Sequence, residues 1–175
     1  MNHADHVALL RPGGVVPGGV WADLGSGTGA FTLALAELLG PGGVIVSVDR
    51  DQAALREQAA ALRQRFPAVA VQPRAADFTR PLAGLPALDG IVMANALHFV
   101  RDQAAVVSLC AGYLKPGGQF ILVEYNAEAG NHWVPYPLSY PRWEKLARQC
   151  GFAATRLLAT RPSRFLREIY SALSG

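Results

Sequence analysis

Closely spaced glycines lie near the start of the chain, in the string Asp23-Leu-Gly-Ser-Gly-Thr-Gly29. The string follows an apolar run, 20–24, and precedes a segment rich in helix formers, 30–39. Glycines after a strand let the backbone turn sharply and approach a ligand closely, and the helix that follows presents unpaired N–H groups to negative charge. This arrangement predicts a nucleotide cofactor that lies against the loop.

Asp49 ends a second β-branched run, 44–48, at about the distance from the glycines where a ribose-binding acid is found. A carboxylate in that place can accept hydrogen bonds from ribose hydroxyls, and it favours unmodified hydroxyls over a 2′-phosphate. The shorter pattern Gly25-x-Gly27-x-x-Ala30 also satisfies the looser dinucleotide fingerprint. The loop and the acid would therefore serve a nicotinamide cofactor as well.

Strand-like and helix-like segments alternate along most of the chain. Apolar and β-branched runs predict strands, and runs of good helix formers that end at glycine or proline predict helices. The predicted strands are 20–24, 44–48, 68–72, 88–93 and 119–125, and the predicted helices are 30–39, 51–65, 102–114 and 143–150. Short connections between alternating strands and helices indicate a parallel sheet with helices on both faces.

Two extended runs near the end of the sequence, 152–160 and 164–173, depart from this alternation. Only Arg161-Pro-Ser163 separates them, whereas a parallel connection needs about a dozen residues or more. They are therefore expected to form an antiparallel hairpin. The complete expectation is an α/β fold with a seven-stranded, mostly parallel sheet and an antiparallel C-terminal hairpin.

The composition is that of one globular domain, which we expect to span residues 1–175. Hydrophobic residues make up 51% of the chain and charged residues 17%, far from the polar signature of disorder. The longest apolar runs are far shorter than the ~20 residues that span a bilayer, so no membrane helix is expected. The formal charge of +3 comes from scattered basic residues, which argues against nucleic acid as a partner. Two cysteines without metal-ligand spacing, and no signal sequence, predict a reduced, cytoplasmic protein without a metal site.

Five motifs follow one another along the chain. They are Asp23-Leu-Gly-Ser-Gly-Thr-Gly29, Val48-Asp49-Arg50, Ala76-Asp77-Phe78, Asn95-Ala-Leu-His-Phe99 and Leu114-Lys-Pro-Gly-Gly118. In this order they resemble the motifs of class I S-adenosylmethionine-dependent methyltransferases, in particular the small-molecule group that includes ubiquinone-biosynthesis-like enzymes. The resemblance covers nearly the whole chain. It implies a three-layer, Rossmann-like methyltransferase fold in which the terminal hairpin inserts its last strand into the sheet.

The resemblance also implies that S-adenosylmethionine is the cofactor and S-adenosylhomocysteine the product. The backbones of Gly25, Gly27 and Gly29 would lie against the methionine part of the cofactor, and Asn95 would lie near its amino acid moiety. The other loop residues that the resemblance places at the cofactor are Ser26 and Thr28.

Charged and aromatic residues complete the implied cofactor site. Asp23 would orient the ammonium group or the loop, and Asp49 would take both ribose hydroxyls. Arg50 would flank the adenine, Asp77 would accept from its exocyclic amine, and the backbone of Phe78 would meet the ring.

Two residues are candidates for a catalytic role. His98 lies just past the fourth predicted strand, on the side where open α/β folds bind ligands, and a neutral imidazole can accept a proton near pH 7. Tyr125 follows the fifth strand. Either side chain could instead only line the pocket. A general base is needed for in-line methyl transfer only when the acceptor is protonated and weakly acidic.

The methyl acceptor is expected to be a small molecule, because the sheet and the hairpin leave no residues for a substrate domain. Selectivity would come from segment 1–19, with its short helix, from loop 126–141, or from a neighbouring subunit; loop 126–141 could also form a homodimer interface. The aromatic and histidine side chains of that loop are His132, Trp133, Tyr136 and Tyr140. The alternatives are a nicotinamide-dependent oxidoreductase and a non-catalytic subunit that binds S-adenosylmethionine.

Overall fold

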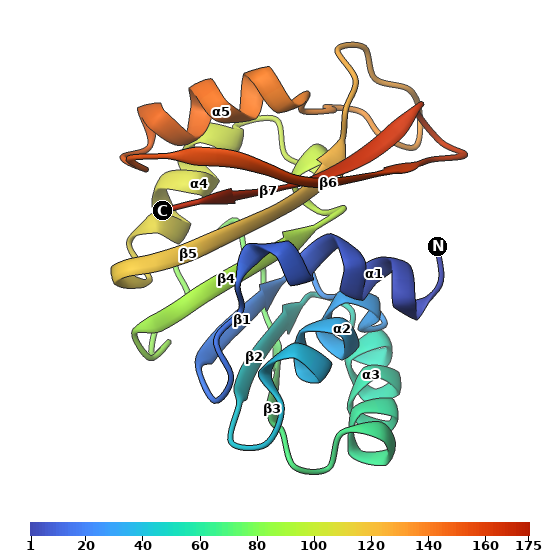
Figure 1. Cartoon of the computed structure of the whole chain (residues 1–175), viewed down its shortest axis with the longest axis vertical. Coiled ribbons are helices and arrows are strands. Elements are labelled where there is room, and N and C mark those ends of the chain that lie inside the picture. The colour runs from blue at the N-terminus through green and yellow to red at the C-terminus, as the bar shows by residue number, and fades with distance from the viewer.

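The computed structural model describes all 175 residues, which build one seven-stranded sheet with strand order β3-β2-β1-β4-β5-β7-β6. The first five strands run parallel, and β7 lies between β5 and β6 and runs antiparallel to both (Figure 1). This topology confirms the predicted fold, including the inserted last strand. The strands are β1 (Val20–Leu24), β2 (Val44–Asp49), β3 (Ala70–Ala75), β4 (Leu88–Ala94), β5 (Leu114–Tyr125), β6 (Thr155–Pro162) and β7 (Glu168–Ser174).

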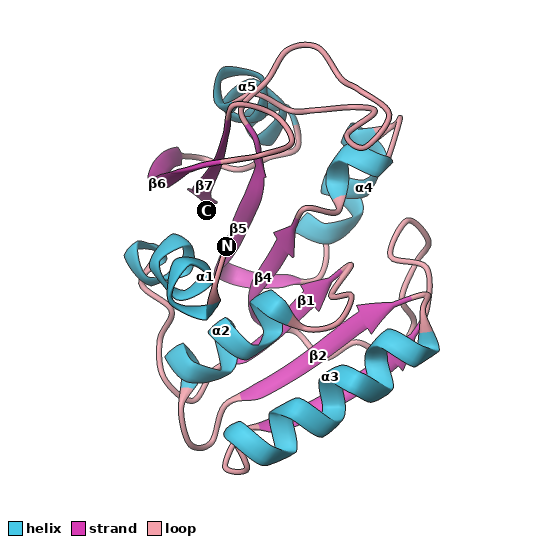
Figure 2. Cartoon of the chain, turned by 90° about the vertical axis from the view of Figure 1, so that its right-hand side faces the viewer, coloured by secondary structure: helices cyan, strands magenta, loops and turns pink.

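Helices cover both faces of the sheet, which gives the molecule three layers (Figure 2). One face carries α1 (His3–Leu10), α2 (Ala30–Leu39) and α3 (Gln52–Arg65), and the other carries α4 (Gln103–Ala111) and α5 (Tyr140–Gln149). Two short 3₁₀ helices, η1 (Arg11–Gly13) and η2 (Leu97–Phe99), complete the elements.

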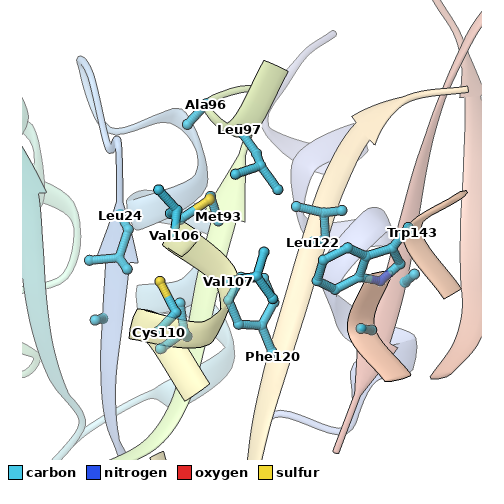
Figure 3. Close-up of a cluster of buried hydrophobic side chains, with 14 of the residues drawn as sticks. Leu24, Met93, Ala96, Leu97, Val106, Val107, Cys110, Phe120, Leu122 and Trp143 are labelled. Carbon is cyan, nitrogen blue, oxygen red and sulfur yellow. The ribbon is translucent and has the colours of Figure 1, made fainter. Parts of the chain in front are cut away.

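Alternation along the central strands divides the core into two layers. In β1, Trp21 belongs to the layer under α1 and α2, whereas Ala22 and Leu24 belong to the layer under α4 and α5. Figure 3 shows side chains of α4 between those of β1 and β5 in the second layer. Cys110 is one of them, and its burial raises the pKa of the thiol to about 12. This cysteine is therefore an inert part of the core.

Several boundaries differ from those predicted. Strand β3 continues through Pro73 to Ala75, because it lies at the edge of the sheet, where a missing N–H is tolerated. Strand β5 begins at Leu114, which pairs with Leu88 before a register shift, and Gly117 takes a left-handed conformation. Helix α5 begins at Tyr140, with a proline in its first turn.

Asp51 is the N-cap residue of α3. Its Oδ1 accepts hydrogen bonds from the N–H groups of Ala53 and Ala54 at 2.8 and 3.1 Å. Asp51→Ala removes this cap and is expected to lower the free energy of unfolding by about 1 kcal/mol. Urea unfolding measures the loss, and Asp51→Ser, which retains a capping oxygen, should recover most of it. Equal stability of Asp51→Ala and the wild type would contradict the prediction.

Candidate cofactor site and active site

A cavity of about 590 Å³ lies where β1, β2 and β4 end, at the carboxyl edge of the parallel strands. This is the edge at which open α/β sheets bind ligands. The cavity gathers seven of the predicted cofactor residues, although they come from four separate segments of the chain. Its lining consists of Gly25, Gly27, Asp49, Arg50, Asp77, Phe78, Thr79, Asn95, Ala96, Phe99, Val100 and Arg101.

The glycine loop takes a conformation that other residues rarely adopt. Gly25, Gly27 and Gly29 have φ angles of 78°, 51° and 90°. A Cβ on Gly25 would lie 2.5 Å from the Cβ of Ala96, and one on Gly29 would collide with the side chain of Gln58. Side chains at Gly25 and Gly29 would therefore collide with their neighbours, so the loop can take this conformation only with glycine at these two positions.

Asp49 joins the glycine loop to the end of β2. Its Oδ2 accepts from the N–H of Gly27 at 2.8 Å, and its Oδ1 accepts from the N–H of Asp51 at 2.9 Å. Each carboxylate oxygen can accept a further hydrogen bond. Because Asp49 lines the cavity, this remaining capacity is available to a ligand with hydroxyl groups.

Asp77 lies at another wall of the cavity, after β3. Its Oδ1 accepts from the backbone N–H and the hydroxyl of Thr79 at 2.9 and 2.7 Å. These hydrogen bonds lower the pKa of Asp77, and the nearby Arg50 and Arg80 lower it further. The carboxylate is held ionised, and its Oδ2 has no partner within the protein, so it can accept a hydrogen bond from a ligand.

Asn95 is the only residue in β4 or the turn after it with a positive φ, 53°. Its side-chain Oδ1 is buried and has no hydrogen-bond partner. An unsatisfied buried acceptor costs about 1–3 kcal/mol. A ligand that carries N–H groups would remove this cost, because Asn95 lines the cavity. Ser26 Oγ is buried and unpaired as well, whereas Thr28 is exposed; neither lines the cavity.

Asp23 lies beneath the loop and does not line the cavity. It is 1% exposed, and its Oδ2 accepts from the hydroxyl of Thr32 at 2.5 Å. Gln58 Nε2 donates to Thr32 Oγ1 at 3.0 Å and to the carbonyl of Gly27 at 3.4 Å, and Gln58 Oε1 accepts from Ser47. The structure therefore places Asp23 where it supports the loop through a buried polar chain.

Sequence reasoning missed Gln58, although a signal for it was present. The buried positions of α3 are Ala54, Leu55, Gln58 and Leu62, so the glutamine falls on the apolar stripe of the helix. A polar residue on such a stripe needs hydrogen-bond partners inside the protein.

Burial raises the pKa of Asp23 to about 7, opposed by the Thr32 hydrogen bond and helped by the charge of Asp49. A carboxyl whose pKa is raised by folding stabilises the protein below its unfolded pKa, and this contribution is lost as the pH rises to the folded value. Asp23→Asn removes the titration. We expect the free energy of unfolding of Asp23→Asn, relative to the wild type, to rise by about 2–3 kcal/mol between pH 5 and pH 8. Urea unfolding at both pH values measures the difference, and a constant difference would show that Asp23 stays ionised.

His98, in the middle of η2, and Tyr125, at the end of β5, lie next to each other outside the cavity lining. Their rings make an edge contact with centroids 5.3 Å apart. Burial raises the pKa of Tyr125, and the charge of Glu124 raises it further, so the phenol stays protonated at neutral pH. His98 Nδ1 lies 2.9 Å from Glu124 Oε2. Glu124 was missed in the sequence, where it stands out as a carboxylate in an otherwise apolar strand.

The two segments expected to select the acceptor, 1–19 and 126–141, lie in different parts of the molecule. Helix α1 packs on α2, and residues 16–19 line a separate cavity at the opposite edge of the sheet. In the loop after β5, Trp133 and Tyr136 are exposed, whereas Tyr140 begins α5 and its ring contacts Tyr170.

No helix is long and apolar enough to cross a membrane. No group of three or more His, Cys, Asp or Glu side chains is arranged to hold a metal ion.

Solved structures share this fold. The YcgJ protein of Bacillus subtilis matches with a TM-score of 0.76 at 13% identity, and the match covers 98% of each chain. The 1,6-didemethyltoxoflavin-N1-methyltransferase of Burkholderia thailandensis matches with a TM-score of 0.72 at 20% identity, over 98% of this chain and 79% of that one. That enzyme was solved with 1,6-didemethyltoxoflavin and S-adenosylhomocysteine bound.

Sequence comparisons identify the family. The ribosomal RNA small subunit methyltransferase H of Paracidovorax citrulli is 41% identical over 59 residues, which span 34% of this chain and only 19% of the relative. A family model described as a methyltransferase domain matches residues 22–120, from β1 to β5. The chain belongs to the methyltransferase-domain family, which confirms its resemblance to class I S-adenosylmethionine-dependent methyltransferases.

Proposed function

We propose that this protein transfers a methyl group from S-adenosylmethionine to a small-molecule nucleophile. One observation carries the proposal: a single cavity joins acceptors suited to three parts of the cofactor. Asp49 would accept from the ribose hydroxyls, Asp77 from the adenine amine, and the unpaired Asn95 Oδ1 from the ammonium group.

The chemistry of the residues fits this cofactor. S-adenosylmethionine supplies a methyl group that is activated by its bond to a sulfonium centre. The protein holds the donor and the acceptor in line and excludes water, which accounts for most of the catalysis in such a reaction. The glycine loop, supported from below by Asp23 and Gln58, would fix the position of the methionine part.

Exposed aromatic rings favour a small organic acceptor. Phe99 lines the cavity and is 62% exposed, and Trp133, Tyr136 and Phe165 are also exposed. They lie after β4, after β5 and in the turn between β6 and β7, which all meet at the carboxyl edge of the sheet. Aromatic rings at a cleft can bury an apolar molecule of modest size. The structural relative from Burkholderia thailandensis was solved with such a molecule, 1,6-didemethyltoxoflavin.

Thermal unfolding with S-adenosylmethionine, S-adenosylhomocysteine and NADH tests the cofactor. A ligand at 100 times its Kd stabilises the folded state by about 2.7 kcal/mol, so either adenosyl compound should raise the Tm measurably. A rise with NADH alone would refute the proposal. Release of S-adenosylhomocysteine with a panel of hydroxyl, amine, thiol and carbon acceptors then tests transfer, and binding without release from any of them would support a non-catalytic subunit.

A further inference from the structure

We propose that His98 and Glu124 form a proton-accepting pair beside the cofactor cavity, and that the methyl acceptor therefore carries an O–H or N–H group. In this pair, His98 Nε2 takes the proton of the acceptor, and Glu124 is a positioning residue that holds the imidazole. The inference rests on the proposed methyl transfer and narrows its substrate class.

Glu124 holds the imidazole through both of its oxygens. Oε1 and Oε2 lie 3.1 and 2.9 Å from His98 Nδ1, and the carboxylate is completely buried. Oε1 also accepts from the backbone N–H of His98, and Oε2 accepts from that of Tyr125. Because Nδ1 faces two acceptor oxygens, it must carry the proton of the neutral ring. The lone pair is therefore on Nε2.

His98 Nε2 is free to accept a proton. It has no hydrogen-bond partner, and it is not among the side-chain atoms that are both unpaired and sealed from solvent. The imidazole lies against the ring of Phe99, with centroids 4.2 Å apart. Phe99 and Ala96, on either side of His98 in the chain, line the cavity. The pair therefore lies next to residues that line the cofactor cavity, although His98 and Glu124 are not among them.

Burial of the Glu124 carboxylate destabilises the fold, since removing its charge from water costs several kcal/mol. A negative charge becomes useful when the imidazole gains a proton, because the carboxylate then stabilises the imidazolium.

The other titratable groups around Glu124 do not compete for this proton. Tyr125 of β5 and Tyr170 of β7 face it, and burial, followed by the charge of Glu124, raises the pKa of both phenols. Tyr170 donates its hydroxyl hydrogen to the carbonyl of Leu138 at 2.9 Å. On α5, Tyr140 and Arg142 lie farther out and act on Tyr170. The imidazole of His98 is the side chain that lies within hydrogen-bond distance of both Glu124 oxygens.

The transfer step balances with these residues. As the O–H bond of the acceptor breaks, the proton passes to His98 Nε2. The electron pair of the oxygen forms the new bond to the methyl carbon, and the pair of the broken C–S bond stays on sulfur as a thioether. The positive charge of the sulfonium is thereby replaced by that of the imidazolium, which later releases its proton to water. An N–H acceptor follows the same scheme.

Nitrogen-15 NMR of the imidazoles in the ligand-free protein tests the pair without any turnover. We expect His98 to be protonated at Nδ1 and unprotonated at Nε2 in its neutral form, and this tautomer to lose its preference in Glu124→Gln. The His98 signals are assigned by their absence in His98→Asn. A neutral His98 that carries its proton on Nε2 would overturn the proposal.

Kinetics with phenol and aniline as probe acceptors test the role in transfer. His98→Asn should lower kcat about 10²–10⁴-fold, with KM little changed, and should abolish the acid limb of the pH–rate profile. Glu124→Gln should give a smaller loss and move that limb. His3→Asn is the matched control, because His3 also pairs with a glutamate, Glu37, at 2.8 Å but lies on the surface at α1. A kcat loss in His98→Asn that leaves the limb in place would refute a base at His98.

Binding of S-adenosylhomocysteine separates this inference from the proposed function. His98→Asn and Glu124→Gln should bind it with the wild-type Kd, because neither residue lines the cavity. Lost binding in both variants would assign the pair a structural role and refute the inference. Failure of the wild type to bind would instead refute the proposed function.

Discussion

Asp49→Ala is expected to raise the Kd for S-adenosylhomocysteine by at least about 100-fold. The variant loses the carboxylate that would accept both ribose hydroxyls. A hydrogen bond to a charged group contributes about 1.5–3 kcal/mol, so two of them account for at least ~3 kcal/mol, or more than a hundredfold in affinity. The loss also frees the N–H groups of Gly27 and Asp51, which now donate to Asp49 at 2.8 and 2.9 Å. Isothermal titration calorimetry measures the change in Kd.

Asp89→Ala provides a matched control for this experiment. Asp89 is also an acid at a strand end, and it pairs with Lys115 at 2.7 Å and accepts from the N–H of Val20. It lies at the amino edge of the sheet, far from the cofactor cavity, so its loss should leave the Kd unchanged. A Kd of Asp49→Ala close to that of Asp89→Ala would remove Asp49 from the cofactor site.

Gly25→Ala should destabilise the protein by about 2–5 kcal/mol. With φ at 78°, an L-residue costs about 1–2 kcal/mol, and the new methyl would lie 2.5 Å from the Cβ of Ala96 and 3.2 Å from the ring of Phe78. Overpacking of this kind adds about 1–3 kcal/mol. Because Ala96 and Phe78 both line the cavity, their displacement should weaken S-adenosylhomocysteine binding as well. Urea unfolding and calorimetry report the two effects separately.

Gly84→Ala isolates the backbone part of this cost. Gly84 has a φ of 73°, but a Cβ there would have no neighbour within 4 Å. Its replacement should cost only the conformational strain and leave ligand affinity intact. If Gly25→Ala lowered the free energy of unfolding no more than Gly84→Ala does, the close approach of the glycine loop to Ala96 would contribute nothing to that loss.

The order of elements could be predicted because it depends on local signals. The short link Arg161-Pro-Ser163 excludes a parallel crossover, and the structure has the antiparallel hairpin, although Arg161 and Pro162 belong to β6 and the turn lies at residues 163–167. The predicted ends of some strands were wrong where the position of the strand in the sheet outweighed the local sequence signal. Pro73 predicts the end of a strand, yet β3 continues because nothing pairs with its outer edge. Residues 115–118, which the sequence placed between a helix and a strand, lie within β5 at the register shift between the Leu88–Leu114 and Gly90–Gln119 pairs.

The candidate site was predictable to the extent that its residues carry distinctive chemistry. Asp49, Asp77 and Asn95 meet in one cavity although they are far apart in the chain. What the sequence could not show is which side of the loop a residue occupies. Asp23 faces the core beneath the loop and His98 turns toward β5, because both side chains find buried polar partners there, Thr32 and Glu124. Such partners are separated by whole elements, so no spacing rule reveals them.

The position of β7 affects how the C-terminal hairpin unfolds locally. Although β6 precedes it in the chain, β6 pairs with the sheet only through β7, so β7 cannot leave β5 without either carrying β6 with it or breaking its pairs with that strand as well. The hairpin should therefore detach as one cooperative unit, with its amides exchanging at a common rate. Its departure would uncover the edge of β5 that carries Glu124 and Tyr125, which pair directly with Tyr170 and Ile169. The local stability of the hairpin thus limits how long the His98–Glu124 pair remains assembled.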